Sequence, residues 1–152
     1  YTANGNAALV DEVQGWGNLD PAVIYDSRAG NVRYQAPPDV SSSTSYGSSF
    51  TAGDVIGVAL DLDNNNIYFA EDNTWSNSGD PESGATGTGA FNIITGYTWV
   101  PFIGLNNATA EVTFASPVQA NSSDANDANG YGVFEFAPPS GYLAVCSKNM
   151  VD

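Results

Sequence analysis

Apolar and polar residues alternate with a period of two along the middle of the chain. Every second residue from Ile56 to Leu62 is a large aliphatic, and the same period returns in residues 67–69. Such alternation is typical of a β-strand with one buried face. Residues 63–66 read Asp-Asn-Asn-Asn, a composition that tolerates the positive φ angles of a tight turn. We therefore predict a β-hairpin over residues 55–70. Its expected buried face consists of Ile56, Val58, Leu60 and Leu62.

Shorter apolar runs between turn residues predict the remaining strands. Many of their residues are β-branched or aromatic, and clusters of Gly, Pro and Asn separate them. The polar stretches 41–49, 71–89 and 119–130 predict loops, and no segment shows the 3.6-residue period of a helix. The further predicted strands are residues 22–25, 32–34, 99–105, 110–114, 133–136 and 142–145. These elements predict an all-β protein, an antiparallel two-sheet β-sandwich with little or no helix.

The length and composition fit a single domain over residues 1–152. The chain is 42% hydrophobic and 12% aromatic, which supplies enough apolar side chains for a core. Because the sequence begins with Tyr1 rather than Met, we expect the domain to be a C-terminal part of a longer chain. No run approaches the roughly 20 apolar residues of a membrane-spanning helix, so we expect no membrane insertion.

Charge and missing residue types exclude several classes of function. The formal net charge is -14, from 17 acidic residues against Arg28, Arg33 and Lys148. Such a surface repels a phosphate backbone, so we expect no nucleic-acid partner. The absence of His removes Ser-His and Cys-His dyads and imidazole zinc ligands. We therefore expect a protein that is not an enzyme.

The hairpin sequence also resembles the SPRY domain family. Residues 53–69 read GDVIGVALDLDNNNIYF, close to the hairpin that SPRY domains carry after a short F-x-x-G-D lead. Shorter similarities follow in residues 73–81 and 97–101. The tail at 136–146 resembles the Pro-Pro-x-Gly-aromatic ending of the phage and environmental branch of the family. The similarity extends over residues 23–149.

The resemblance implies a SPRY-like jelly roll, a bent antiparallel sandwich that binds through its loops. Eukaryotic members of the family grip peptides, and phage members sit on tail fibres and other virion components. The opening strands of the family have no evident counterpart at the start of this sequence. We expect them to be missing, supplied by another segment or replaced. Residues 119–130 are an insertion relative to the family and a candidate contact loop.

Four residues are candidates for ligand binding. Trp75 lies in a polar loop, where an aromatic ring can stack on a ligand or cap the edge of the sandwich, and Trp16 allows the same two roles. Tyr46 adjoins a Ser-rich stretch with the adaptable composition of binding surfaces. Asp80 belongs to the loop stretch that resembles the family. Trp99, in an apolar run, is expected in the core.

A calcium site is an alternative interpretation of the aspartates near the hairpin turn. Asp61, Asp63 and Asp72 echo the spacing of a calcium-binding loop, but Asn66 stands where that loop needs Gly. The hairpin turn explains the first two aspartates without a metal, so we expect no cofactor. A second candidate set in the neighbouring loop is Glu71, Asp72, Asp80 and Glu82.

Paired carboxylates are the remaining option for catalysis, because glycosidases use two of them. The candidate pairs are Asp11 with Glu12 and Glu71 with Asp72. Adjacent residues of a strand point to opposite faces, so such neighbours are not expected to converge on one glycosidic bond.

These observations favour a non-enzymatic structural or attachment module of a tailed-phage virion, on a tail fibre or as surface decoration. We expect it at the virion surface or outside the cell. Its expected partners are other virion proteins and a glycan or protein of the host surface, and a homotrimer would indicate a fibre. Two alternatives stay open: a glycan-binding, lectin-like module of a secreted bacterial protein, and a glycan depolymerase.

Overall fold

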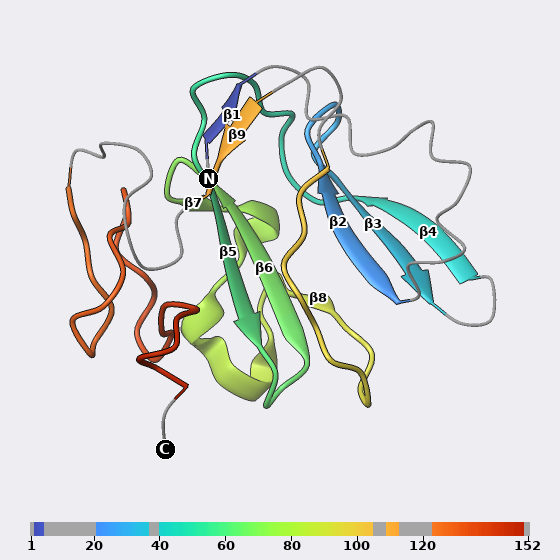
Figure 1. The fold of residues 1–152 in the computed structure, drawn as a ribbon. Coiled ribbons are helices and arrows are strands. Elements are labelled where there is room, and N and C mark those ends of the chain that lie inside the picture. Colours follow the sequence, from blue (N-terminus) through green and yellow to red (C-terminus); the bar gives the residue numbers. More distant parts are fainter. Residues whose placement is uncertain (1, 5–20, 37–39, 105–108, 113–122, 151–152) are drawn as a thin grey trace.

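The computed structural model describes residues 2–4, 21–36, 40–104, 109–112 and 123–150 of the chain (Figure 1). Regular structure in these residues is almost entirely β, arranged in three antiparallel sheets. The helical elements among them are two short 3₁₀ helices, η2 (Ser76–Ser78) and η3 (Pro81–Thr86). Neither has the length or the apolarity that a membrane crossing requires. The predicted all-β, antiparallel fold class is confirmed.

The first sheet contains three strands in the order β2-β3-β4. They are β2 (Ala22–Asp26), β3 (Asn31–Ala36) and β4 (Val40–Ser45). The turn between β2 and β3 depends on Gly30, whose φ of 62° suits a residue without a side chain. A Cβ on Gly30 would also lie 2.3 Å from the carbonyl oxygen of Ser48. The predicted strands at 22–25 and 32–34 are confirmed, and so is the turn between them.

The second sheet contains the predicted hairpin. Its strands are β5 (Ile56–Asp61), β6 (Asn66–Glu71), β7 (Thr74–Trp75) and β8 (Phe91–Asn92), and the last two both pair with β6. Asn65, at the end of the β5–β6 turn, adopts a φ of 59°, as the Asn-rich composition predicted. A third sheet pairs β1 (Thr2–Asn4) with β9 (Thr109–Glu111).

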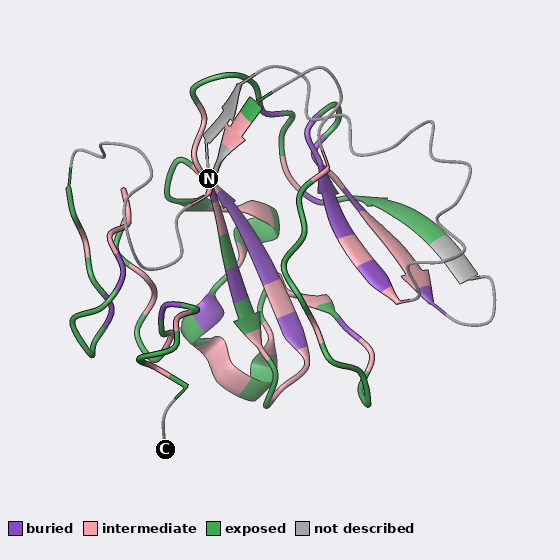
Figure 2. Cartoon of the chain, in the orientation of Figure 1, coloured by how far each residue is buried: buried purple, intermediate pink, exposed green. Residues whose placement is uncertain are grey.

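An aromatic core joins the two larger sheets. Tyr25 of β2 stacks on Phe50 at 5.1 Å and on Phe69 of β6 at 5.0 Å between ring centroids. Tyr46 meets Phe69 edge-on at 5.9 Å. The buried core cluster consists of Tyr25, Val32, Tyr46, Phe50, Ile56 and Phe69. Buried positions dominate β2 and β6 (Figure 2). Rings from both sheets and from the segment between β4 and β5 therefore hold the sandwich together.

A buried carboxylate lies at the end of β2. Asp26 is 1% exposed, and its Oδ2 lies 3.1 Å from Nη2 of Arg28 and 2.9 Å from Nη2 of Arg33. Burial by itself raises the pKa of Asp26, but hydrogen bonds from Arg28 and the charges of both arginines outweigh it and hold this pKa below its ordinary value. Two of the three basic residues of the chain therefore serve one internal contact.

The outer strand β5 corrects the expectation for the buried face of the hairpin. Ile56 is 7% exposed, whereas Val58, Leu60 and Leu62 are 58%, 37% and 58% exposed. Val58 lies opposite Phe69 in the register and therefore shares its face of the sheet. Because β5 is the outer strand, only Ile56 at its start reaches the aromatic core. The alternation predicted the strand correctly but not the extent of its burial.

Three predicted strands are not found in the described residues. Residues 99–104 form no strand, Trp99 is half-buried rather than in the core, and Val100 is 74% exposed. Residues 133–136 contribute only the isolated bridge between Phe134 and Ala125, and residues 142–145 form no strand. These runs have the apolar residues of strands, but in the described residues they form no ladder longer than that single bridge. Pro101 also lacks the amide hydrogen that a ladder needs.

The opposite correction applies to the Ser-rich stretch. Residues 41–45 belong to β4, which pairs with β3 along its whole length, so the predicted loop is shorter than expected. Ser42 to Ser45 are exposed at the edge of the sheet, where hydroxyl side chains are well tolerated. Of the predicted strand at 110–114, β9 covers the first part, and residues 113–114 lie outside the described residues.

The aromatic core predicts a contrast between two residues that face each other across β5 and β6. Phe69→Ala removes the ring stacked on Tyr25 and is expected to lower the free energy of unfolding by about 3–5 kcal/mol. Val58→Ala changes the exposed member of the same pair and is expected to change the free energy of unfolding by about 0.5 kcal/mol or less. Urea denaturation followed by circular dichroism measures both, and equal losses would contradict the assigned core.

The ion pairs of Asp26 predict a pH-dependent share of the stability. Asp26→Asn is expected to lower the free energy of unfolding at pH 7 by about 1.5–3 kcal/mol, because two guanidinium groups lose their charged acceptor. The lowered pKa means that this stabilisation is complete above the ordinary Asp pKa of about 3.9 and is lost as the pH falls through the folded-state value. Asp63→Asn, in the exposed hairpin turn, is the control. Urea denaturation between pH 2 and pH 7 measures the free energy of unfolding of each variant and of the wild type. The difference from the wild type should shrink at low pH for Asp26→Asn but not for Asp63→Asn.

Candidate functional site

A groove of about 370 Å³ opens where the loop after β6 meets the C-terminal part of the chain. Trp75, at the end of β7, forms part of its wall, and acidic side chains of the η3 region stand beside it. Three prolines complete the apolar surface. We call this site the Trp75 groove, and its lining residues are Trp75, Gly79, Asp80, Pro81, Glu82, Ala137, Pro138 and Pro139.

A tight turn positions Trp75 on the sheet. Asp72 and Asn73 both adopt positive φ, at 45° and 65°, as in the two-residue hairpin turns of the I′ class. The chain therefore reverses directly after β6, and Trp75 pairs opposite Ala70. On that face its ring meets Tyr68 edge-on, with 6.4 Å between the ring centroids. Trp75 is half-buried, so one part of the indole packs on the sheet and the rest lines the groove.

The acidic side of the groove is the N-terminus of η3. Asp80 is its N-cap, and Oδ1 of Asp80 accepts a hydrogen bond from the amide of Glu82 at 3.0 Å. Pro81 occupies the first helical position, where the missing amide hydrogen has no cost. Ser83 donates its hydroxyl to the carbonyl of Asp80 at 2.6 Å. These contacts fix the direction of the Asp80 carboxylate at the rim.

Two long-range hydrogen bonds attach the tail to η3. Oε1 of Glu82 accepts the amide of Ser140 at 2.7 Å, and the hydroxyl of Tyr142 donates to the carbonyl of Pro81 at 3.1 Å. Burial, followed by the negative charges of nearby groups that include Asp61, raises the pKa of Tyr142 to about 12. The tyrosine thus stays neutral and able to donate at physiological pH. The two bonds hold Pro138 and Pro139 against the Trp75 loop.

Tyr68 lies under the wall of the groove. It is fully buried, its ring packs against Trp75, and a Cβ on Gly79 would come within 3.4 Å of that ring. In the part of the chain that the structure describes, the Tyr68 hydroxyl has no hydrogen-bond partner. A buried hydroxyl without a hydrogen-bond partner lowers the free energy of unfolding, so the stabilising contribution of Tyr68 comes from its ring alone.

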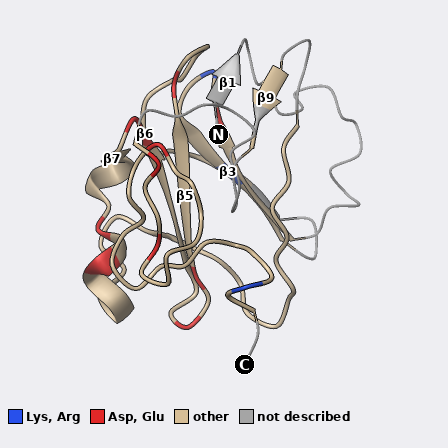
Figure 3. Ribbon diagram, turned by 60° about the vertical axis from the view of Figure 1, so that its left-hand side comes forward, with Lys and Arg blue, Asp and Glu red and all other residues tan. Residues whose placement is uncertain are grey.

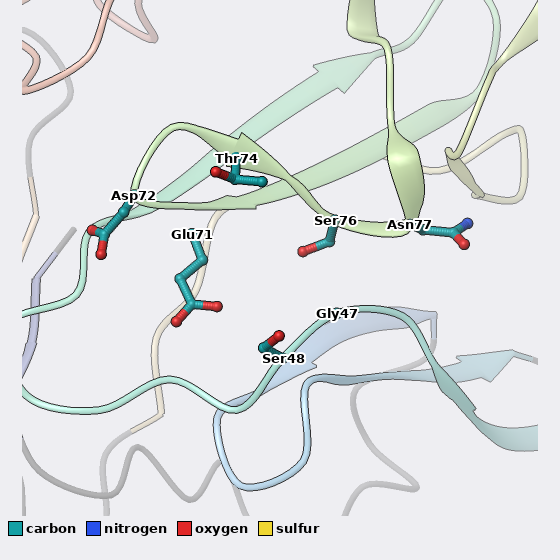
Figure 4. Close-up of a pocket in the computed structure, with 7 residues that line it drawn as sticks. All are labelled: Gly47, Ser48, Glu71, Asp72, Thr74, Ser76 and Asn77. Atoms are coloured by element: carbon teal, nitrogen blue, oxygen red, sulfur yellow. The ribbon is translucent and has the colours of Figure 1, made fainter.

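A second, polar recess of about 340 Å³ lies between the segment that follows β4 and the residues that follow β6 (Figure 4). Hydroxyl and carboxylate groups face it, and Tyr25 reaches its edge through a 3.1 Å hydrogen bond with Ser76. Burial, and then the charges of Asp54 and Asp72, raise the pKa of Glu71. A Cβ on Gly47 would lie 2.2 Å from the Tyr25 hydroxyl, which explains the glycine. The lining residues are Gly47, Ser48, Glu71, Asp72, Thr74, Ser76 and Asn77.

The structure brings together two of the four predicted ligand-binding residues. Trp75 and Asp80 both line the Trp75 groove. Tyr46 lies elsewhere, buried in the core with its hydroxyl donating to the carbonyl of Gly89 at 2.8 Å. Trp16 lies outside the described residues. Asp80 and Trp75 are therefore the candidates that the geometry supports.

The aspartates of the calcium alternative do not meet. Asp61 ends β5, whereas Asp72 follows β6 at the opposite end of the hairpin, where it accepts the amide of Val55 at 2.9 Å. Asp61 instead accepts the backbone amide and the side chain of Asn64, at 3.0 and 2.7 Å, as a turn residue does. Among the described residues, no three carboxylates form a group that could hold a metal ion, the Glu71, Asp72, Asp80 and Glu82 set included.

Of the two carboxylate pairs considered for catalysis, one lies in the described residues. Asp11 and Glu12 lie outside them. Glu71 and Asp72 point in different directions, Glu71 towards Ser48 and Asp72 away from it (Figure 4). Acidic residues outnumber basic ones along the ribbon and are spread over turns and strand ends (Figure 3).

The prolines of the groove are the site residues that the local sequence pattern did not reveal. Pro138 and Pro139 were visible as a turn and as part of the family resemblance, but nothing nearby in sequence points to Trp75. Pro81 and Glu82 carried a clearer signal, because Asp-Pro-Glu is a helix N-terminus by composition. That pattern predicts the helix cap at Asp80 but not the hydrogen bonds that attach the C-terminal tail to η3.

Comparison with known proteins gives one family. The family model described as SPRY domain matches residues 15–117, which include the hairpin, Trp75 and Asp80 but not the Pro-Pro tail. No curated protein and no solved structure matches the chain. The matched residues cover more than half of the sequence.

Two tyrosines of the groove predict opposite effects of the same substitution. Tyr142→Phe loses a hydrogen bond to Pro81 and is expected to lower the free energy of unfolding by about 1 kcal/mol. Tyr68→Phe removes a hydroxyl that has no partner in the described residues and is expected to leave the stability unchanged or to raise it. Urea denaturation at pH 8 measures both.

The pH dependence of stability above pH 8 gives a second test of the Tyr142 hydrogen bond. Because folding raises the pKa of Tyr142 from 10.0 to about 12, its contribution is complete below pH 10 and is lost as the pH rises towards 12. Tyr142→Phe should therefore lose less stability over that range than the wild type. A larger loss in Tyr68→Phe than in Tyr142→Phe at pH 8 would contradict the assigned hydrogen bonds.

Proposed function

The chain belongs to the SPRY domain family, and on that premise we propose that it is a non-enzymatic attachment module of a tailed-phage virion. SPRY domains are typically non-catalytic and mediate protein–protein interactions, which gives this chain the general role of a protein-binding module. The finer proposal is that it sits on a tail fibre or another surface component. There it binds a virion protein or a protein of the host surface.

The observation that carries the binding role is the Trp75 groove. It combines a half-buried tryptophan, prolines and two exposed carboxylates. Aromatic side chains with apolar neighbours and a polar rim are typical of the central contacts of protein interfaces. The hairpin and the bonds of the tail hold these groups in place without the partner, so binding does not have to order them.

Two features support the virion part of the proposal. The tail that carries Pro138 and Pro139 resembles the ending found in the phage branch of the family, and in this protein it completes the groove. The net charge of -14 favours solubility and opposes binding to nucleic acid, as suits a component on the outside of a particle. A homotrimer in solution would place the module on a fibre.

The location predicts labelling of intact particles. Antibodies against the 152-residue chain are expected to decorate the exterior of purified phage particles in immunogold electron microscopy. Particles treated with the same antibodies after absorption with the purified chain serve as the control. Labelling found only on disrupted particles, or on neither intact nor disrupted particles, would overturn the virion proposal.

The groove predicts which tryptophan matters for attachment. Trp75→Ala is expected to weaken binding of the purified chain to host cells by about tenfold or more, as loss of a central interface residue does. Trp99→Ala changes a half-buried tryptophan that does not line the groove and is the matched control. Flow cytometry with labelled chain measures both. Removal of surface protein by protease should abolish binding, whereas loss after glycan removal alone would favour the lectin-like alternative.

A further inference from the structure

The two carboxylates of the Trp75 groove are held by one oxygen each. Oδ1 of Asp80 caps the amide of Glu82, and Oε1 of Glu82 accepts the amide of Ser140. Within the described residues, no hydrogen bond or ion pair engages the second oxygen of either carboxylate. Both side chains belong to exposed residues. Each acid is thus fixed in direction while one acceptor faces solvent at the rim of the groove.

Among the described residues, no cation pairs with this rim. Arg28 and Arg33 both bind Asp26, and no ion pair involving Lys148 occurs in the described residues. The groove therefore keeps two negative charges beside an apolar surface of Trp75 and prolines. Charge complementarity calls for a positive group that also has an apolar stem.

We propose that the Trp75 groove receives an arginine side chain of the protein partner. The aliphatic stem packs along Pro138 and Pro139, the planar guanidinium lies against the indole of Trp75, and its N–H groups donate to the free oxygens of Asp80 and Glu82. A volume of about 370 Å³ is ample for one such side chain. This inference rests on the proposed function, because it names the chemistry by which that binding module recognises its partner.

Arginine matches the groove better than other occupants. A planar guanidinium stacks on an aromatic face and presents several donors in a fixed plane, which suits two carboxylates whose directions are already set. A proline-rich segment would use the aromatic and proline surface but leave both acids without a partner. A sugar would meet acceptors from the acids but no charged or amide donor side chain among the lining residues.

The test is a titration of the 152-residue chain with two short peptides, acetyl-Pro-Arg-Pro-amide and its citrulline counterpart. Citrulline keeps the shape of arginine and removes the charge. The indole N–H signal of Trp75 in a nitrogen–proton NMR spectrum reports binding, and its loss in Trp75→Phe assigns it. We expect a saturable shift with the arginine peptide and affinity at least about tenfold weaker with the citrulline peptide.

Isosteric variants separate this site from the general negative charge of the surface. Asp80→Asn and Glu82→Gln keep the acceptor oxygens for the amides of Glu82 and Ser140 but remove the charges, and each is expected to weaken arginine binding by about threefold. Asp63→Asn, which removes an exposed charge from the hairpin turn, should leave the affinity unchanged.

Three results would overturn the inference: equal binding of the citrulline peptide, an equal loss in Asp63→Asn, or shifts that leave Trp75 unaffected. Its failure is distinct from failure of the proposed function. If Trp75→Ala abolishes attachment to host cells while arginine peptides do not bind, the attachment role stands and the arginine assignment is wrong. If arginine peptides bind as expected while antibodies find no chain on particles, the arginine assignment stands and the virion proposal is wrong.

Discussion

Stacking of Tyr25 between Phe50 and Phe69 is the interaction on which the rest of the molecule depends. It joins the two larger sheets through ring faces about 5 Å apart, and the Tyr25 hydroxyl continues outward to Ser76 beside the polar recess. The side chains on the two faces of β6 have different contacts. Phe69 fills the core, while Tyr68 on the other face supports Trp75. A shift of β6 in the core would therefore move the wall of the groove as well.

Local pattern predicted the elements whose partners are adjacent in sequence. The hairpin at 55–70 combines alternation with a turn that needs positive φ, and the β2–β3 pair combines two short apolar runs with such a turn. In both, sequence pattern and turn chemistry agree. The predictions failed where the partner is distant. Residues 99–104 are apolar enough for a strand but have no paired neighbour among the described residues, and the serines of β4 gain a strand from β3. Alternation also did not show that Val58 and Leu60 lie beyond the reach of the other sheet.

The candidate site divides in the same way. Trp75 was a candidate because an aromatic residue stands out in a polar loop, and Asp80 because its loop stretch resembles the family. Pro138 and Pro139 were not, since the contact depends on Glu82 reaching Ser140, 58 residues later in the chain. Tyr46 shows the converse error, because its surroundings in sequence are polar while its neighbours in space are Tyr25 and Phe69. A polar composition in the surrounding sequence therefore does not show that an aromatic residue lies at the surface.

The scarcity of basic residues has a practical consequence for any experiment on this protein. Trypsin cleaves after Lys and Arg, and the chain offers only three such bonds, two of them within or next to the salt-bridged β2–β3 hairpin. Peptide mapping with trypsin would therefore yield a few long fragments and under-represent the chain in mass spectra of a mixture. An amine-reactive dye finds a single lysine side chain, the exposed Lys148, far in sequence from Trp75. A protease specific for acidic residues would reveal the chain much more fully, because the sequence holds 17 of them.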